Sequence, residues 1–434
     1  MKRINFSRKQ RCYLTMVFGF ILVLSVSVMI QSLALPRHLT LSPGQSITLS
    51  VNFPLSFNGV KKDLLSLSRF DHFFKQDLTL QSSDSTNYDI DLTLFGKIPI
   101  RKLHVDVMEP PKVIPCGHAI GVLVASRGVI VVGHIPVYGV DRKQYYPAKQ
   151  AGLKVGDVLL AVDSTIIHNV EDMERFLAKV EDDKPLTLTI QRHEKIIKRQ
   201  IQPVLTEIQP QKKYMLGIFI EDPAAGVGTL SFYTPSNRAF AGLGHQIANI
   251  GGQNGIKLEW GEIVLAHING VRIGTPGKPG EKIGIFNAAQ NPIGKIHKNC
   301  KFGIYGTAYP GFEEYLKEKP IPIAFSSQIK EGPALIYTVI NGTEVEAFKV
   351  EIIKVYKQSQ PRDKGLVVKV TDERLLEVTG GIIQGMSGSP IIQDGRLVGA
   401  VTHVFVNDPT RGYGVLAEWM VRESSQIALP QEAS

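Results

Sequence analysis

Ser387 lies in a glycine-rich segment, residues 380–392, that reads GGIIQGMSGSPII. Small neighbours let the backbone turn sharply, so that successive N–H groups can point at one spot. Such a turn can stabilise the oxyanion that forms when a serine hydroxyl attacks a carbonyl. The pattern G-x-S-G also occurs in ordinary tight turns between strands. It therefore leaves two interpretations open, a nucleophile or a purely structural turn.

Serine needs a general base, because its hydroxyl is a weak nucleophile at neutral pH. His245 lies in the small-residue stretch AGLGHQ (241–246), 142 residues before Ser387. That order and spacing suit a histidine in one β-barrel and a nucleophile in the next. We therefore predict His245 as the base. The other histidines of this region are His267, His297 and His403.

The serine segment resembles the G-D-S-G-G-P turn of chymotrypsin-like peptidases, and GAVTHV (399–404) occupies the place of the segment that borders their specificity pocket. The resemblance implies Ser387 as the nucleophile and the N–H groups of Gly385 and Ser387 as the oxyanion hole. It implies no catalytic role for Ser389. Met386 stands where zymogens of that family carry an aspartate that pairs with a freed N-terminus, so we expect no such activation switch.

A carboxylate would orient the imidazole of the base. Between His245 and Ser387, aspartate occurs only at Asp363 and Asp372. Asp372 follows a predicted strand, 366–370, and lies 15 residues before Ser387, nearer the serine than in the chymotrypsin pattern. The competing interpretation of Asp372 is an aspartate that ends a strand in a turn.

The composition is that of a globular chain with several domains. At roughly 100–200 residues per domain, 434 residues suit two to four of them. Five of the basic residues behind the net charge of +9 lie within the first 11 positions, and no acidic residue precedes Asp63. The basic balance therefore reflects the N-terminus, and we expect no nucleic-acid partner. Cys116 and Cys300 are either two buried thiols or, on an oxidising side of a membrane, a disulfide.

Residues 1–36 are predicted as a cytoplasmic basic tail and a signal-anchor helix. No charged residue occurs from Cys12 to Pro36, and about 20 helical residues span a hydrocarbon layer. The basic flank should stay in the cytoplasm, so that the chain is a single-pass membrane protein with its working domains on the extracytoplasmic side. Because Ser32-Leu33-Ala34 could be a cleavage site, a removed signal peptide is the alternative.

The remainder is predicted to be mainly β. Alternating segments at 46–52 and 88–94 indicate a small β domain or stalk over residues 37–110, which ends at Glu109-Pro110-Pro111. From 210 to 434, short strands punctuated by glycine follow one another without a helical pattern. This predicts a chymotrypsin-like double β-barrel peptidase domain.

Residues 112–205 are predicted as a PDZ domain. The run P-A-x-x-A-G-L-x-x-G-D-x-L (147–159) resembles the central signature of PDZ domains, and a helix-like stretch (170–179) and a strand (185–190) follow it. PDZ domains bind an extended peptide as an added strand at a sheet edge. By this resemblance the edge that binds the peptide ligand would be formed by Gly121, Val122 and Leu123.

A closer resemblance covers the chain from the anchor to the C-terminus. The order of anchor, PDZ domain and peptidase domain, with the motifs AGLGH, TDxRLLExTGGIxQGMSGSPII and AVTHVFVNDPT, resembles the stage IV sporulation protein B peptidases of endospore-forming bacteria. The resemblance implies a catalytic triad of His245, Asp372 and Ser387. It also implies an enzyme without a metal or organic cofactor, and neither an H-E-x-x-H motif nor a glycine-rich phosphate loop occurs in the sequence.

The same resemblance implies a sporulation signalling function in the space between the forespore membranes. The peptidase would cleave itself and then a membrane-bound regulator of an intramembrane metalloprotease, which in turn activates a sigma factor. Two other functions compete with this one. The chain could be a non-catalytic PDZ scaffold, or a general protein-quality-control peptidase, although exported peptidases of that kind usually place the PDZ domain after the peptidase domain.

Overall fold

The computed structural model describes residues 8–59, 69–72, 75–81, 84–125, 128–192, 195–208, 211–221, 225–247, 260–286, 292–356, 358 and 360–427. The chain forms two compact units. The first comprises Met1–Pro111 with two short later segments, Ala324–Ile329 and Tyr356–Arg362. The second comprises the rest of the chain, and each unit is described by itself.

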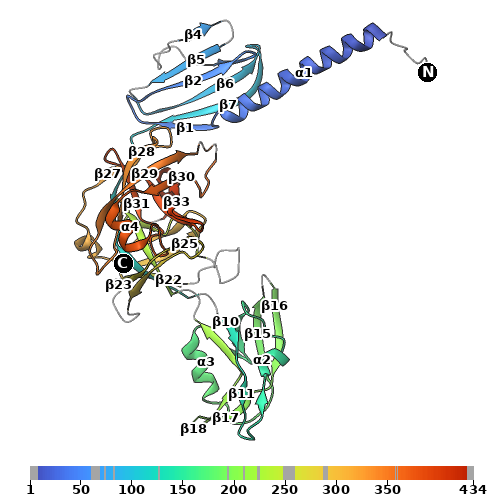
Figure 1. The fold of residues 1–434 in the computed structure, drawn as a ribbon, viewed down its shortest axis with the longest axis vertical. Coiled ribbons are helices and arrows are strands. Elements are labelled where there is room, and N and C mark those ends of the chain that lie inside the picture. The colour runs from blue at the N-terminus through green and yellow to red at the C-terminus, as the bar shows by residue number, and fades with distance from the viewer. Residues whose placement is uncertain are drawn as a thin grey trace, which may run out of the picture. The chain divides into compact units, whose positions relative to one another are not determined.

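The first unit begins with α1 (Arg8–Ala34), a long apolar helix (Figure 1). Its segment Cys12–Leu33 has a mean hydropathy of 2.4 and is long and apolar enough to cross a membrane. The chain that leaves the helix is fixed by Arg101, whose guanidinium donates to the carbonyls of Ser32 and Pro36 at 2.5 and 2.6 Å. The predicted N-terminal helix is therefore confirmed as a candidate membrane span.

Two β-sheets follow and share one hydrophobic core. One sheet has the order β1-β7-β6-β3 and the other β2-β5-β4. Their alternating residues, such as Leu41, Leu80 and Ile90, are buried in a single cluster, so the predicted small β region is a sandwich. The strands are β1 (His38–Leu41), β2 (Ser46–Asn52), β3 (Leu55–Asn58), β4 (Arg69–His72), β5 (Lys75–Gln81), β6 (Thr86–Leu94) and β7 (Ile98–Val107).

The second unit contains a PDZ-like sheet with the order β16-β15-β13-β10-β19. Gly152 and Gly156 have positive φ angles (72° and 91°) and turn the chain from α2 into β13. Asn169 caps α3 by accepting the N–H of Asp172 at 2.8 Å. The elements are β10 (Val129–His134), β11 (Val137–Tyr138), β12 (Gln144–Tyr145), α2 (Pro147–Gln150), β13 (Val158–Val162), β14 (Thr165–Ile166), α3 (Val170–Leu177), β15 (Leu186–Arg192), β16 (Lys195–Ile201), β17 (Val204–Ile208), β18 (Gln211–Met215) and β19 (Ile218–Glu221).

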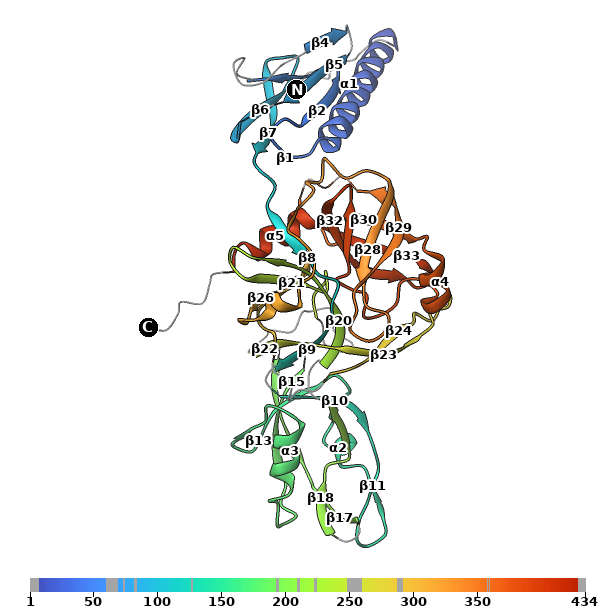
Figure 2. The same cartoon turned by 90° about the vertical axis from the view of Figure 1, so that its left-hand side faces the viewer.

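The first barrel closes through six strands in the order β21-β26-β25-β22-β9-β20, because β20 pairs back with β21 (Figure 2). A hairpin, β23–β24, leaves this barrel, and β8 and β27 extend the sheet from β20. The elements are β8 (Lys112–Pro115), β9 (Ala119–Ala125), β20 (Ala225–Thr234), β21 (Ala239–Gly242), β22 (Trp260–Leu265), β23 (His267–Arg272), β24 (Glu281–Ile285), β25 (Gly294–Cys300), β26 (Gly303–Ala308), η1 (Phe312–Tyr315) and β27 (Ile321–Pro322).

The second barrel is closed in the order β28-β29-β30-β33-β32-β31. Two β-barrels with a PDZ domain and an N-terminal apolar helix confirm the predicted fold class. The elements are β28 (Gly332–Thr338), β29 (Glu346–Val355), β30 (Leu366–Val370), α4 (Glu373–Thr379), β31 (Pro390–Gln393), β32 (Arg396–Phe405), β33 (Asp408–Leu416) and α5 (Ala417–Ser424).

The structure corrects the predicted peptide-binding edge of the PDZ domain. Gly121, Val122 and Leu123 lie in β9, which pairs with β20 on one side and β22 on the other. A strand with both neighbours in place has no free edge to offer a peptide. The same pairings assign β8 and β9 to the first barrel, although the sequence interpretation began the PDZ domain at residue 112.

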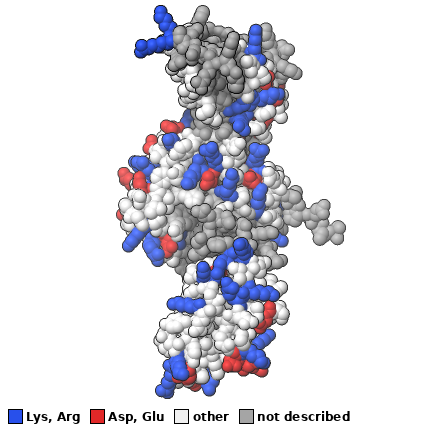
Figure 3. Space-filling model, turned by 90° about the vertical axis from the view of Figure 1, so that its right-hand side faces the viewer, with Lys and Arg blue, Asp and Glu red and all other residues white. Residues whose placement is uncertain are grey.

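The charges on the face drawn in Figure 3 and the described cysteines single out no further site. Lys and Arg side chains are interspersed with Asp and Glu over the described part of the face drawn in Figure 3. Cys116 is buried and Cys300 is partly buried, and both are free thiols. No group of three or more His, Cys, Asp or Glu side chains that could hold a metal ion occurs among the described residues.

Candidate active site

Ser387 lies in the turn between α4 and β31. Gly385 and Gly388 on either side have φ angles of 91° and 98°, a left-handed region that favours glycine. A Cβ at position 388 would lie 1.9 Å from the carbonyl oxygen of Thr229, so the turn is pressed against β20 of the first barrel. The half-buried Ser387 donates its hydroxyl proton to the carbonyl of Thr402 at 2.7 Å.

His245 follows β21 in a second strained turn. Leu243 and Gly244 both have a φ of 66°, which is rare for leucine. A Cβ at position 244 would approach Thr402 Cγ2 to 3.0 Å, so glycine allows this turn to contact the second barrel closely. Nδ1 of His245 lies 2.9 Å from the carbonyl oxygen of Gln246. A carbonyl can only accept, so Nδ1 carries the proton and Nε2 is free to accept one.

A second imidazole, that of His403 on β32, lies beside His245. The two ring centroids are 4.9 Å apart and the ring planes are inclined by 36°. Desolvation lowers the pKa of both histidines, and the proximity of His245 lowers that of His403 further. Both rings are therefore neutral at pH 7, the form in which an imidazole can act as a base.

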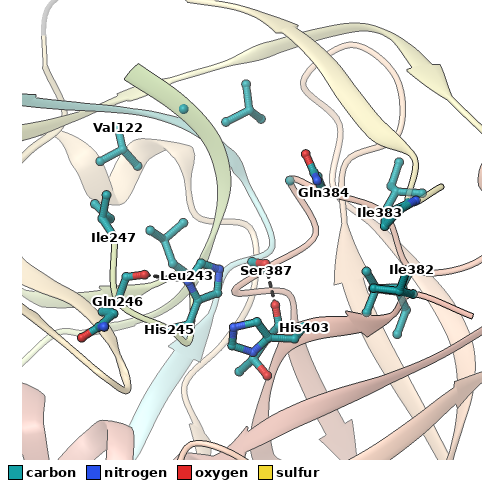
Figure 4. A pocket seen from close by; sticks show the side chains of 17 residues that line it. Val122, Leu243, His245, Gln246, Ile247, Ile382, Ile383, Gln384, Ser387 and His403 are labelled. Carbon is teal, nitrogen blue, oxygen red and sulfur yellow. Dashed lines mark hydrogen bonds between the residues drawn. The ribbon is translucent and has the colours of Figure 1, made fainter. Parts of the chain in front are cut away.

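His245, His403 and Ser387 line one pocket of about 520 Å³ (Figure 4). The first barrel contributes one wall of this pocket and the second barrel the other. The rest of its lining is largely apolar and includes Val122, Val227, Leu243, Ile247, Pro279, Ile382, Ile383, Val404 and Val406. No lysine, arginine, aspartate or glutamate is among the described residues that line it. The pocket can therefore accept an apolar side chain next to the serine hydroxyl.

The first two carbonyl groups of the serine turn accept hydrogen bonds from Lys282 and Thr229, which do not line the pocket. The carbonyl of Gln384 accepts the backbone N–H of Lys282 at 2.9 Å. The carbonyl of Gly385 accepts the hydroxyl of Thr229 at 2.6 Å. Since the C=O and N–H of a trans peptide point in opposite directions, the N–H of Gly385 is directed away from Lys282.

The next peptide of the turn is fixed in the same way. The carbonyl of Met386 accepts the N–H of Ser389 at 2.9 Å, which directs the N–H of Ser387 to the opposite side. The N–H of Met386 donates to the carbonyl of Ile383 at 3.1 Å. Among the described residues, no backbone carbonyl accepts the N–H of Gly385 or that of Ser387. Two donors next to the serine hydroxyl are thus left for a ligand.

Two protein families match parts of this chain. Residues 212–421 match the family described as SpoIVB peptidase S55, and residues 144–192 match the PDZ domain family. The chain carries a SpoIVB-type serine peptidase domain and a PDZ domain. No curated protein matches the chain significantly.

The chain is also similar to solved proteases at low identity. The active form of the Rv3671c protease from M. tuberculosis is 15% identical over 49% of this chain and 78% of its own, with a TM-score of 0.29. The inactive form is 14% identical over 46% and 84%, with a TM-score of 0.27. These scores are too low to bear on the site.

The structure does not bring Asp372 to the other two predicted triad members. Asp372 is the N-cap of α4, and its carboxylate accepts the N–H groups of Leu375 at 3.1 Å and Lys349 at 3.2 Å. It does not line the pocket that contains His245 and Ser387. Both acceptor oxygens are engaged by the backbone, so in this conformation the carboxylate holds the start of a helix.

Sequence reasoning missed the groups that surround His245. The carbonyl of Gln246 takes the place expected for a carboxylate at Nδ1. Asp363 is the other aspartate between His245 and Ser387 in the sequence, and its charge raises the pKa of His403. Desolvation and the charges of His245 and Lys364 lower that pKa by more. The motif THV at 402–404 contained a signal for His403, because it lies within the segment GAVTHV that was expected to border the pocket.

The PDZ domain offers a different edge from the one predicted. Its terminal strand β19 pairs with β10 and, among the described strands, with no other. Ile218 and Ile220 pack into the PDZ core, while 54% of Phe219 is exposed. In the structure, Gly217 has a φ of 68° and turns the chain into β19. The signal for this turn in the sequence is the glycine of the Leu216-Gly217 pair, directly before the strand.

Proposed function

We propose that Ser387 is the nucleophile and His245 the general base of this serine peptidase. The observation that carries the proposal is the shared pocket, in which the serine hydroxyl and an imidazole with a free Nε2 lie beside two unused N–H groups. Ser387 would attack the scissile carbonyl while His245 takes its proton and later delivers it to the leaving amine.

The oxyanion of the tetrahedral intermediate would bind the N–H groups of Gly385 and Ser387. Three hydrogen bonds on the far side of the turn support this, because they hold the donors in place before substrate arrives. The serine hydroxyl must first leave the carbonyl of Thr402, which is a rotation about one side-chain bond. Such looser contacts are common before substrate binds.

The substrate class we propose is a protein segment with an apolar residue before the scissile bond. The apolar lining of the pocket beside Ser387 supports this, and the lining residues described leave no carboxylate there to pair with a lysine or arginine. The free edge of β19 supports a second contact, in which the PDZ domain binds an extended peptide as an added strand.

We also propose that the peptidase is membrane-tethered, faces the extracytoplasmic side and acts in sporulation signalling. It would cleave itself and a membrane-bound regulator of an intramembrane metalloprotease. The apolar helix α1 and the match of residues 212–421 to the SpoIVB peptidase S55 family support this proposal.

Two matched serine variants of the full-length chain in detergent test the nucleophile. Ser387→Ala should reduce cleavage of apolar-site peptides by about three orders of magnitude or more. Ser389→Ala is the control, because Ser389 is fully buried two residues further on. Equal activity of both variants would refute the assignment and favour the scaffold alternative.

Mass spectrometry of wild type and Ser387→Ala tests the signalling function. Wild type should show a defined self-cleavage that the variant lacks, and cleavage of a co-expressed membrane-bound regulator should depend on Ser387. Sequence-independent degradation of unfolded casein, without defined self-cleavage, would instead indicate a quality-control peptidase.

A further inference from the structure

Lys282 on β24 is the most unusual buried group outside the assigned site. Its side chain is only 5% exposed, and its ammonium contacts two hydroxyl groups, Thr338 Oγ1 at 2.7 Å and Thr229 Oγ1 at 3.3 Å. No salt bridge to Lys282 occurs within the described part of the chain. Burial lowers the pKa of Lys282 to about 7. A buried lysine without a counter-charge is costly, so a structural role alone does not account for it.

The hydrogen bonds of Lys282 lead directly to the serine turn. A lysine nitrogen that donates to Thr229 obliges that hydroxyl to use its single proton elsewhere. Thr229 uses it on the carbonyl of Gly385, at 2.6 Å. Both the ammonium and the neutral amine have enough N–H groups to supply Thr229 and Thr338 together, so this arrangement is independent of the charge of Lys282.

The aliphatic part of Lys282 supports the same turn. A Cβ at position 385 would lie 3.1 Å from Cβ and Cδ of the lysine, so the glycine backbone rests on the side chain. The backbone N–H of Lys282 holds the carbonyl of Gln384 at 2.9 Å, and Gln384 in turn donates to Gly280 at 2.8 Å. Hairpin β23–β24 therefore contacts the turn through both main chain and side chain.

We propose that Lys282 is a positioning residue that sets the oxyanion turn through Thr229. In chymotrypsin-like zymogens the corresponding task falls to a freed N-terminus, which pairs with an aspartate next to the serine. Here that position is Met386, which is fully buried. The internal lysine supplies the nitrogen, and Thr229 transmits its effect to Gly385, so the turn is formed without cleavage of the chain.

Four variants test this inference, which rests on the proposed catalytic role of Ser387. Lys282→Met keeps the length of the side chain and removes the donor, and Thr229→Val removes the relaying hydroxyl. Each should lower kcat by about tenfold to a hundredfold and leave KM within about threefold, because a misplaced turn affects the transition state more than substrate binding. Thr229→Ser, which keeps the hydroxyl, should restore kcat. Thr338→Val, which removes only the other partner, should change it less than threefold.

The double variant Lys282→Met/Thr229→Val separates a relay from two independent contacts. Its kcat should equal that of the less active of the two single variants. If the two single-variant reductions in kcat multiply in the double variant, the relay is overturned. The melting temperature of Lys282→Met should not fall, because a lysine nitrogen that is buried without a counter-charge is removed. If this variant does not fold, the contrast between Thr229→Val and Thr229→Ser decides, and equal kcat for these two would overturn the proposal.

A readout that needs no turnover keeps the inference distinct from the proposed function. Hydrogen exchange of the hydrogen-bonded amides within 384–388, those of Gln384, Met386 and Gly388, should accelerate at least tenfold in Lys282→Met and in Thr229→Val, but not in Thr338→Val. If wild type shows no Ser387-dependent cleavage, the catalytic proposal fails while this measurement still tests the positioning role. Unchanged exchange at 384–388 would overturn it.

Discussion

Replacing Asp372 separates a helix cap from a triad member. Its carboxylate accepts the N–H groups of Leu375 and Lys349 and lies outside the pocket of Ser387. Serine also caps helices, but its hydroxyl cannot stabilise an imidazolium. Asp372→Ser and Asp372→Ala therefore form a matched pair, in which only the first keeps the cap.

The expected effect of each substitution is a change in stability. Loss of an N-cap costs about 1 kcal/mol, within a range of about 0.5–2 kcal/mol, so Asp372→Ala should lower the melting temperature by about 2–4 °C for a domain of this size. Asp372→Ser should stay within about 1 °C of wild type. The kcat of both variants should fall by less than about tenfold, because neither substitution touches His245 or Ser387.

The assay is peptide cleavage under saturating substrate, with melting followed by calorimetry on the same samples. A triad aspartate contributes about four orders of magnitude to kcat. If Asp372→Ser keeps the wild-type melting temperature and loses three or more orders of magnitude, the reasoning from the helix cap is refuted. The triad implied by the family resemblance would then form through a rearrangement of α4.

Three further substitutions or conditions have definite expected outcomes. Because desolvation lowers the pKa of His245, the acid limb of kcat/KM should have its midpoint below pH 6.5, and a midpoint above 7 would contradict a neutral resting base. Gly388→Ala should cost at least about 2 kcal/mol in urea unfolding, since φ is 98° and the added Cβ would meet a carbonyl at 1.9 Å. Asp157→Ala should expose the PDZ domain of the full chain to limited proteolysis, because it leaves Arg192, which donates to both carboxylate oxygens at 2.7 Å, without its partner. Asp182→Ala, in an exposed ion pair, should not.

Sequence patterns predicted the local elements well, because alternation and turn residues act within a few positions. The segment 46–52 is β2, the predicted strand 366–370 is β30, and the helix-like stretch 170–179 contains α3. The same patterns say nothing of which strand pairs with which. The strand at 119–125 was therefore assigned to the PDZ domain, although its partner β20 lies about 100 residues further along the chain.

The candidate site shows the same limit: the residues in local motifs were predicted, and those placed by long-range contacts were not. Ser387 and His245 each lie in a short motif of small residues, and both motifs form turns that reach one pocket. The position of Asp372 depended on a hydrogen bond to Lys349, 23 residues away, which no local pattern encodes. Lys282 gave no signal either, since a lysine in an alternating strand is ordinarily taken as solvent-exposed, yet this one is buried.

The turn that carries Ser387 leads into β31 of the second barrel but is held by contacts with the first barrel. Thr229 on β20 donates its backbone N–H to the carbonyl of Ser387 at 2.9 Å and its hydroxyl to that of Gly385. Hairpin β23–β24, which also leaves the first barrel, adds the contacts of Lys282. Formation of the two N–H donors is thus tied to the association of the barrels, and any substitution that loosens the contact between them should reduce kcat before it unfolds either barrel.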